Sequence, residues 1–190
     1  MDFVALGWPP DGPTLRLDYR RFAYAGKFVV GSTGKAVVRD GSESEAEYAD
    51  HVRAAASFDP DRTDADCLVI RYVTVRDDRQ GDGLGSRLLA FVTARADAHG
   101  YDRVRIAVNN PAAYVAAYRA GFAFTGRETG LAELVCERPA DAPADRDVDT
   151  YRDGLDRYRE RDLDSAARER LDAKAAGLPT LVAMPVESGG

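Results

Sequence analysis

The glycine-rich segment near the middle of the chain has the composition best suited to binding a ligand. It reads Gln80-Gly81-Asp82-Gly83-Leu84-Gly85-Ser86 and falls between a predicted strand and a predicted helix. Glycine lets the backbone turn sharply and approach a ligand closely. The open N–H groups at the start of the following helix favour an anion. The segment therefore predicts a phosphate or diphosphate site, although a plain tight turn into a helix would need the same glycines.

Two well-known nucleotide-binding motifs do not fit this segment. A Walker loop requires Gly-Lys-Ser or Gly-Lys-Thr at its end, and neither follows here. A dinucleotide-binding turn requires G-x-G-x-x-G/A and an acidic residue that ends the next strand. Ser86 occupies the third glycine position, and Asp102 begins the next strand instead of ending it. Both motifs are excluded as the main interpretation.

The elements around the loop are predicted by hydrophobic spacing. Residues 67–75 have the near-continuous apolar content of a strand buried on both faces, and 104–108 form a second one. A helix between them carries Leu84, Leu88, Val92 and Ala96 at every fourth position and ends at His99-Gly100. Asn110 is the expected N-cap of a second helix, with Pro111 in its first turn and Gly121 as its stop.

The flanking segments predict further strands. Residues 3–8 and 14–19 read as an N-terminal hairpin, 19–30 as a weakly indicated helix, 35–39 as a strand and 40–50 as a loop. Residues 52–58 pair with 67–75 across an Asp-Pro-Asp turn, and 122–125 with 131–137 form a last hairpin. Strands and helices in this order predict an α/β fold with a mixed sheet flanked by helices.

Gln80-x-x-Gly83-x-Gly85 resembles motif A, R/Q-x-x-G-x-G/A, of the GNAT N-acetyltransferase superfamily. Asn110, Ala113 and Gly121-Phe122 match the later N-x-x-A…G-F pattern of that family. The resemblance covers about residues 14–139 and is strongest over 68–122. It implies a GNAT-like α/β fold: a mixed, mostly antiparallel central sheet flanked by helices, with splayed fourth and fifth strands.

The resemblance also implies a co-substrate, acetyl-CoA, and the residues that hold it. The main chain of Val73, Thr74 and Val75 would pair with the pantetheine arm, and Asn110 would contact it or cap its helix. The diphosphate would lie on the amides of Gln80, Gly81, Asp82, Gly83, Leu84, Gly85 and Ser86. A neutral amine would attack the thioester directly, and the N–H of Val75 would stabilise the oxyanion.

The proton-transfer residues are less well indicated. Family members often carry a tyrosine acid seven residues after the asparagine, where this chain has Ala117. Tyr118 is our first candidate for the acid and Tyr114 the second. The remaining alternative is that both tyrosines pack in the core and water protonates the thiolate. Strand 67–75 offers no carboxylate as a base, and Asp66 at its start is a turn residue, so a water chain is expected to deprotonate the amine.

Composition limits the classes of partner. The net charge is −6, with 32 Asp and Glu against 26 Lys and Arg, which disfavours nucleic acid. Asp-rich, Lys-poor chains occur in salt-adapted proteins, and a GC-rich genome is an equal explanation. No apolar run approaches the ~20 residues of a membrane span, and no basic signal-peptide start is present, so a cytoplasmic protein is expected. Cys67 and Cys136 stand alone, which predicts buried thiols and no metal site.

The C-terminal part falls outside the resemblance. We divide the chain into a catalytic domain over 1–139 and a linker with charged helices over 140–190. One helix face carries Val148, Tyr151, Leu155 and Tyr158, which favours packing within the chain over a homodimer contact or a lid. The acceptor is expected to be a small-molecule or protein amine. The rival functions are a non-catalytic acetyl-CoA sensor on the same fold and an unrelated nucleotide-binding α/β protein.

Overall fold

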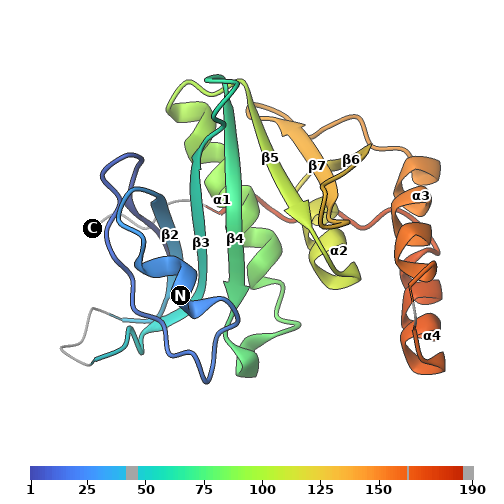
Figure 1. Cartoon of the computed structure of the whole chain (residues 1–190), viewed down its shortest axis with the longest axis horizontal. Coiled ribbons are helices and arrows are strands. Elements are labelled where there is room, and N and C mark those ends of the chain that lie inside the picture. The colour runs from blue at the N-terminus through green and yellow to red at the C-terminus, as the bar shows by residue number, and fades with distance from the viewer. Residues whose placement is uncertain (42–46, 162, 186–190) are drawn as a thin grey trace.

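The computed structural model describes residues 1–41, 47–161 and 163–185 and is built around one mixed sheet (Figure 1). Within these residues the strand order is β1-β2-β3-β4-β5-β7-β6. All neighbours are antiparallel except β4 and β5, which confirms the predicted mostly antiparallel α/β architecture. The strands are β1 Asp2–Gly7, β2 Gly34–Arg39, β3 Val52–Pro60, β4 Cys67–Val75, β5 Arg103–Val108, β6 Ala123–Glu128 and β7 Leu134–Pro139.

Helices and an irregular segment cover the two faces of the sheet. The helix α1 (Leu84–Ala98) lies behind β4 in Figure 1 and buries Leu88, Leu89 and Phe91 against the strands. The helix α2 (Pro111–Arg119) follows β5, and a short 3-10 helix η2 (Asp77–Arg79) follows β4. On the opposite face, the apolar side chains of residues 15–28 pack on β2 and β3.

The parallel pairing between β4 and β5 is short. It joins Cys67–Ile70 to Arg103–Ile106 and ends there. Both strands continue, β4 to Val75 and β5 to Val108, and β5 stays paired with β7 on its other side. The last residues of the two central strands therefore have no hydrogen-bond ladder between them. Figure 1 shows the two strands diverging toward these ends.

The N-terminal prediction is wrong in its pairing. β1 pairs with β2, not with residues 14–19, which are extended but form no strand. Leu15 and Leu17 are nevertheless buried in alternation, because they pack on the sheet face as a crossing segment. The expected helix over 19–30 is reduced to a 3-10 helix, η1 (Ala25–Val29). The expected loop over 40–50 falls partly on residues 42–46, outside the described residues.

The C-terminal helices pack within the same chain, as predicted. They are α3 (Val148–Arg159) and α4 (Ser165–Lys174), each begun by an aspartate whose side chain accepts a first-turn N–H. Tyr151, Leu155 and Tyr158 are at most 1% exposed and join the main core. Four tyrosines meet between α2 and α3, and we call them the tyrosine cluster: Tyr114, Tyr118, Tyr151 and Tyr158.

The tyrosine cluster should make the protein sensitive to alkali. Burial raises the pKa of all four phenols above their ordinary 10.0, that of Tyr151 to about 12. A raised folded pKa means that the stabilisation is complete below pH 10 and is lost as the pH rises above it, since only the unfolded chain ionises there. We expect the urea midpoint to fall steeply above pH 10. Tyr19→Phe, at an exposed site, should not change this slope, and a midpoint constant across that range would contradict the expectation.

Candidate functional site

A small cleft lies between β4 and β5 beyond the point where their pairing ends. Its volume is about 130 Å³. One wall comes from β4, with Arg71, Tyr72 and Val73, and the other from β5 and the residues after it. The remaining lining residues are Tyr24, Ile106, Ala107, Val108, Asn109, Asn110, Ala113 and Glu133. The missing ladder and the start of α2 thus create a cavity at the centre of the sheet.

The edge of β4 that faces this gap is unpaired. The N–H of Arg76 bonds to the carbonyl of Arg53 at 2.9 Å, on the β3 side. Successive residues of a strand present their N–H and C=O groups to alternate sides. The main-chain groups of Val75 and Val73 therefore point to the β5 side, where the ladder has ended. Thr74 lies between them, with its buried hydroxyl lacking a partner among the described residues.

The glycine-rich loop connects η2, the short helix that follows β4, to α1. Gly81 and Gly83 have φ of +92° and +74°, a region that favours glycine. Gly83 is the N-cap of α1 and has no side chain to cap it, so the first-turn N–H groups of Leu84, Gly85 and Ser86 face the loop. Gln80 and Asp82 are exposed, and the Gln80 amide donates to Asp77 at 3.2 Å. The main-chain N–H groups of Gln80 and Asp82 bond to the carbonyls of Asp77 and Arg79, both at 3.4 Å, so the open donors of the loop are those of Gly81 and of residues 83–86.

A cation lies beside the loop that the sequence analysis did not identify. A Cβ added to Gly83 would be 4.0 Å from both terminal nitrogens of Arg119, at the end of α2. Within the described part of the chain, Arg119 makes no ion pair with a carboxylate. The guanidinium therefore adds positive charge to the main-chain donors, and both favour an anion.

Asn110 has the predicted capping role. Its side-chain oxygen accepts the N–H of Ala113 at 2.9 Å, and Pro111 is the first residue of α2. The Asn110 amide donates to Asn109 at 3.0 Å. Both asparagines line the cleft, so the capping bond also fixes the cleft's far end.

The tyrosine acid candidates lie in the core and not in the cleft. Tyr118 and Tyr114 are 0% exposed, and neither lines the cavity. The Tyr118 hydroxyl accepts the N–H of Phe124 at 2.9 Å, and the Tyr114 hydroxyl donates to the carbonyl of Tyr151 at 3.1 Å. This placement favours the packing alternative for both residues.

We therefore expect Tyr118→Phe to keep kcat and its pH dependence. The variant loses the acceptor for the Phe124 N–H, and a buried unsatisfied donor costs about 1–3 kcal/mol of stability. Steady-state kinetics and urea unfolding measure the two effects separately. A lower kcat in a variant that is still fully folded would instead indicate that Tyr118 acts as the acid.

Two cleft residues were missed by the sequence analysis. Tyr24 has a left-handed backbone, φ 60°, and its ring centroid lies 5.7 Å from that of Tyr72. Its hydroxyl accepts from Asn109 at 3.4 Å, so Tyr24 bridges the β4 and β5 walls. The positive φ is a local feature that functional sites often hold, but no sequence signal predicts it.

Glu133 is the second missed residue and a carboxylate. One of its oxygens accepts from the Thr129 hydroxyl at 3.0 Å. Among the described residues it has no ion-pair partner, whereas the cationic neighbour in the lining, Arg71, is paired with Asp59. Glu133 precedes β7, so its place in the cleft depends on tertiary packing.

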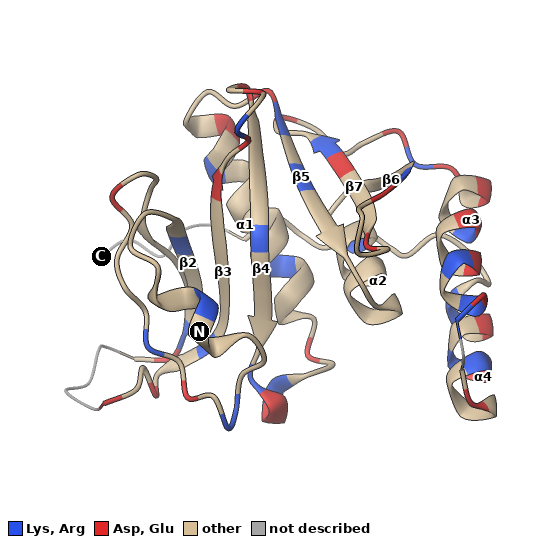
Figure 2. Cartoon of the chain, viewed as in Figure 1, with Lys and Arg blue, Asp and Glu red and all other residues tan. Residues whose placement is uncertain are grey.

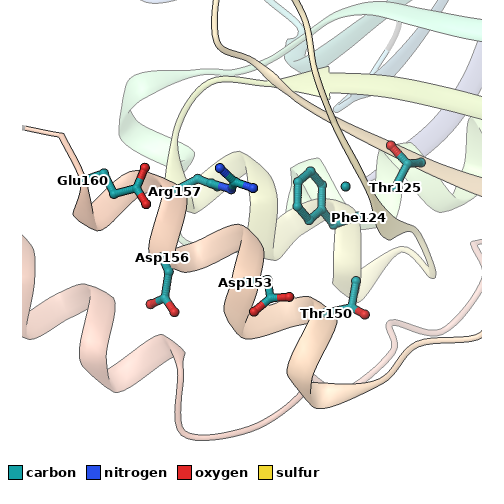
Figure 3. Close-up of a pocket in the computed structure, with 8 residues that line it drawn as sticks. Phe124, Thr125, Thr150, Asp153, Asp156, Arg157 and Glu160 are labelled. Atoms are coloured by element: carbon teal, nitrogen blue, oxygen red, sulfur yellow. The ribbon is translucent and has the colours of Figure 1, made fainter.

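A larger hollow lies at the far edge of the sheet, between β6 and α3 (Figure 3). Its volume is about 660 Å³. It is lined by Phe124, Thr125, Gly126, Thr150, Asp153, Asp156, Arg157 and Glu160, none of which belongs to the glycine-rich loop or the β4 edge. The cleft between β4 and β5 is therefore the candidate site.

The titratable side chains outside the cleft show no metal site in the part of the chain that the structure describes. In the described ranges no group of three or more His, Cys, Asp or Glu side chains is placed to hold a metal ion. Burial raises the pKa of the Cys136 thiol to about 12 and also raises that of Cys67. Charges of both signs alternate over the surface, most densely on α3 and α4 (Figure 2). No described helix is long and apolar enough to cross a membrane.

Comparison with known proteins gives a family and several structures. The model of the acetyltransferase (GNAT) family matches residues 8–122. No curated protein matches the chain. An N-acetyltransferase structure from Staphylococcus aureus Mu50 is similar at 17% identity and a TM-score of 0.47, over 57% of this chain and 68% of that one. A GCN5-related N-acetyltransferase from Kribbella flavida is similar at 23% identity and a TM-score of 0.45, over 56% of this chain and 67% of that one. A Bacillus subtilis acetyltransferase in complex with CoA is similar at 14% identity and a TM-score of 0.45, over 56% of this chain and 76% of that one.

Proposed function

Because this chain belongs to the GNAT acetyltransferase family, whose members use acetyl-CoA, we propose that it transfers an acetyl group from acetyl-CoA to an amine. One observation carries the proposal. The edge of β4 that has no strand partner lines a cleft, and the chain runs from its end through the short helix η2 into the glycine-rich loop at the start of α1. A ligand with an extended amide-containing arm and a diphosphate matches that sequence of donors. The acceptor is a small-molecule or protein amine.

In this proposal the coenzyme lies along β4. The main chain of Val73 and Val75 pairs with the pantetheine arm as a neighbouring strand would. The main-chain N–H groups of Gly81 and of residues 83–86 hold the diphosphate, and Arg119 supplies the charge that main-chain donors lack. Asn110 contacts the arm at the far wall.

The chemistry is a direct displacement at the thioester carbonyl. The neutral amine forms a bond to the carbonyl carbon, and the N–H of Val75 donates to the developing oxyanion. Glu133 takes the proton that the amine releases. The intermediate collapses by breaking the carbon–sulfur bond, and water protonates the departing CoA thiolate. The products are the acetylated amine and CoA.

Calorimetric titration with acetyl-CoA, CoA and NAD tests the coenzyme, and thiol release over a panel of primary amines tests turnover. The proposal expects binding of acetyl-CoA and CoA, no binding of NAD, and release of CoA with at least one amine. Binding of acetyl-CoA without release by any amine would favour the sensor alternative. Binding of NAD without binding of acetyl-CoA or CoA would contradict the proposal that the protein uses acetyl-CoA.

Arg119→Gln should weaken acetyl-CoA binding by about tenfold, the loss of one charge-assisted contact to the diphosphate. The weakening should diminish as salt is added, because added salt screens the charge that is removed. Arg168→Gln, at an exposed position on α4, is the control and should leave the affinity unchanged. Equal affinities for wild type and Arg119→Gln would remove Arg119 from the site.

A further inference from the structure

The end of α3 contacts the far wall of the cleft, although the family match ends at residue 122. β5 has lost its β4 partner at this point, so within the sheet its last residues pair with β7 alone. The hydroxyl of Tyr158, a residue 1% exposed, donates to the carbonyl of Val108 at 3.1 Å. The C-terminal extension therefore holds a strand end that the sheet itself leaves unsupported on one side.

Arg161 makes the next two contacts. Its guanidinium donates to the carbonyl of Asn109 at 2.8 Å and to that of Ala132 at 2.6 Å. It also lies over the ring of Tyr158, 4.6 Å from the ring centroid. One side chain thus links the end of β5 to the turn between β6 and β7. A planar guanidinium can bridge two carbonyls in this way, whereas an ammonium is a point donor.

The carbonyls that are held belong to cleft residues or their neighbours. Val108 and Asn109 line the cavity, and Ala132, with φ 57°, immediately precedes Glu133. The turn is also fixed from within, because the Thr129 hydroxyl accepts the N–H of Glu133 at 3.2 Å. Arg161 itself does not line the cavity. Its contacts act on the position of the wall and not on the ligand.

We propose that Tyr158 and Arg161 are positioning residues that hold the β5 wall and the Glu133 turn at the spacing which the pantetheine arm and its thioester require. This inference rests on the proposed function, since it assumes acetyl-CoA in the cleft. It assigns the C-terminal extension a part in the site that neither the packing nor the dimer alternative gave it.

Two probes separate this role from general stabilisation. Acetyl-CoA spans the loop and the cleft, whereas adenosine 3′,5′-bisphosphate, its nucleotide end, lacks the pantetheine arm. We expect Arg161→Met to raise the Kd of acetyl-CoA about tenfold, the equivalent of one charge-assisted hydrogen bond. The Kd of the bisphosphate should not change. Arg161→Lys, which can serve one carbonyl, should fall between, and Tyr158→Phe should also weaken acetyl-CoA selectively.

Arg157→Met is the matched control. Arg157 lies on α3, four residues before Arg161, lines the larger hollow and pairs with Glu128 at 3.6 Å, away from the cleft. Its variant should bind both probes like wild type. Calorimetry well below each variant's thermal midpoint excludes unfolding as a cause.

Each outcome is decisive. Selective weakening of acetyl-CoA by Arg161→Met supports the proposal. Unchanged affinities, or equal weakening of both probes, would overturn it while leaving the proposed function intact. If wild type binds neither probe, the proposed function fails first and this inference fails with it.

Discussion

Gly83→Val is expected to weaken acetyl-CoA binding by about 30-fold, or roughly 2 kcal/mol, while the protein remains folded. Gly83 has φ +74°, and a branched side chain is strongly disfavoured there. Relieving the strain would rotate the peptide groups on either side of the residue, and these groups supply the donors of the loop. Calorimetric titration measures the loss.

The chain offers a control for the backbone strain. Gly100 has φ +80°, lies just beyond the other end of α1, and has no atom within 4 Å of an added Cβ. Gly100→Val should therefore lose a comparable amount of stability but keep the coenzyme affinity. Full affinity in Gly83→Val would show that the loop does not hold the diphosphate. Equal loss in both variants would assign the effect to α1 and not to the loop.

Glu133→Gln is expected to lower kcat by about 100-fold, at the lower end of what proton transfer by a positioned side chain contributes. Glutamine keeps the size of the side chain and can still contact Thr129, but it cannot take the proton of the amine. The affinity for acetyl-CoA should be unchanged. The measurement is thiol release with the best amine of the panel, over a range of pH.

The pH series distinguishes a base from a residue that only shapes the cleft. As the pH rises, hydroxide can remove this proton in place of the carboxylate, so the deficit of Glu133→Gln should shrink. A deficit that stays constant would indicate a packing effect. Glu128→Gln on the same hairpin is the control, because its side chain is exposed and does not line the cleft. Full activity of Glu133→Gln would show that Glu133 is not the base and that water removes the proton.

The middle of the chain was predictable because its signals are local. The apolar run of β4, the four-residue spacing in α1, and Asn110 with Pro111 each specify an element without reference to distant residues. The same segments carry the family motif, so the fold and the family were predicted together. The C-terminal helix face was likewise recognised from spacing alone.

The N-terminal segment shows what periodicity does not determine. Leu15 and Leu17 alternate correctly between buried and exposed positions, but alternation does not identify a hydrogen-bonding partner. The next stretch buries Phe22, Ala25 and Phe28, whereas Val29 is 47% exposed. That spacing of three is the repeat of a 3-10 helix. The pairing of β1 with β2 was set by long-range contacts.

The candidates for proton transfer were the hardest to predict from the sequence. Tyr118 was selected by its distance from Asn110 along one helix, and α3 covers that helix face. Gly154 of α3 leaves room there, since a Cβ on it would come within 2.0 Å of the Tyr114 hydroxyl. Tyr24 and Glu133 reach the cleft from segments remote in the sequence. Sequence spacing cannot report such convergence.

Only four residue pairs join β4 to β5, so the sheet consists of two antiparallel lobes that meet along a narrow seam. Antiparallel ladders join the strands within each lobe, and few hydrogen bonds cross from one lobe to the other. A ligand bound between β4 and β5 beyond Ile70 would supply the missing hydrogen bonds and connect the two lobes. Occupancy of the crevice would then be transmitted as stiffening of the whole sheet, and slower amide exchange in both lobes would be its signature.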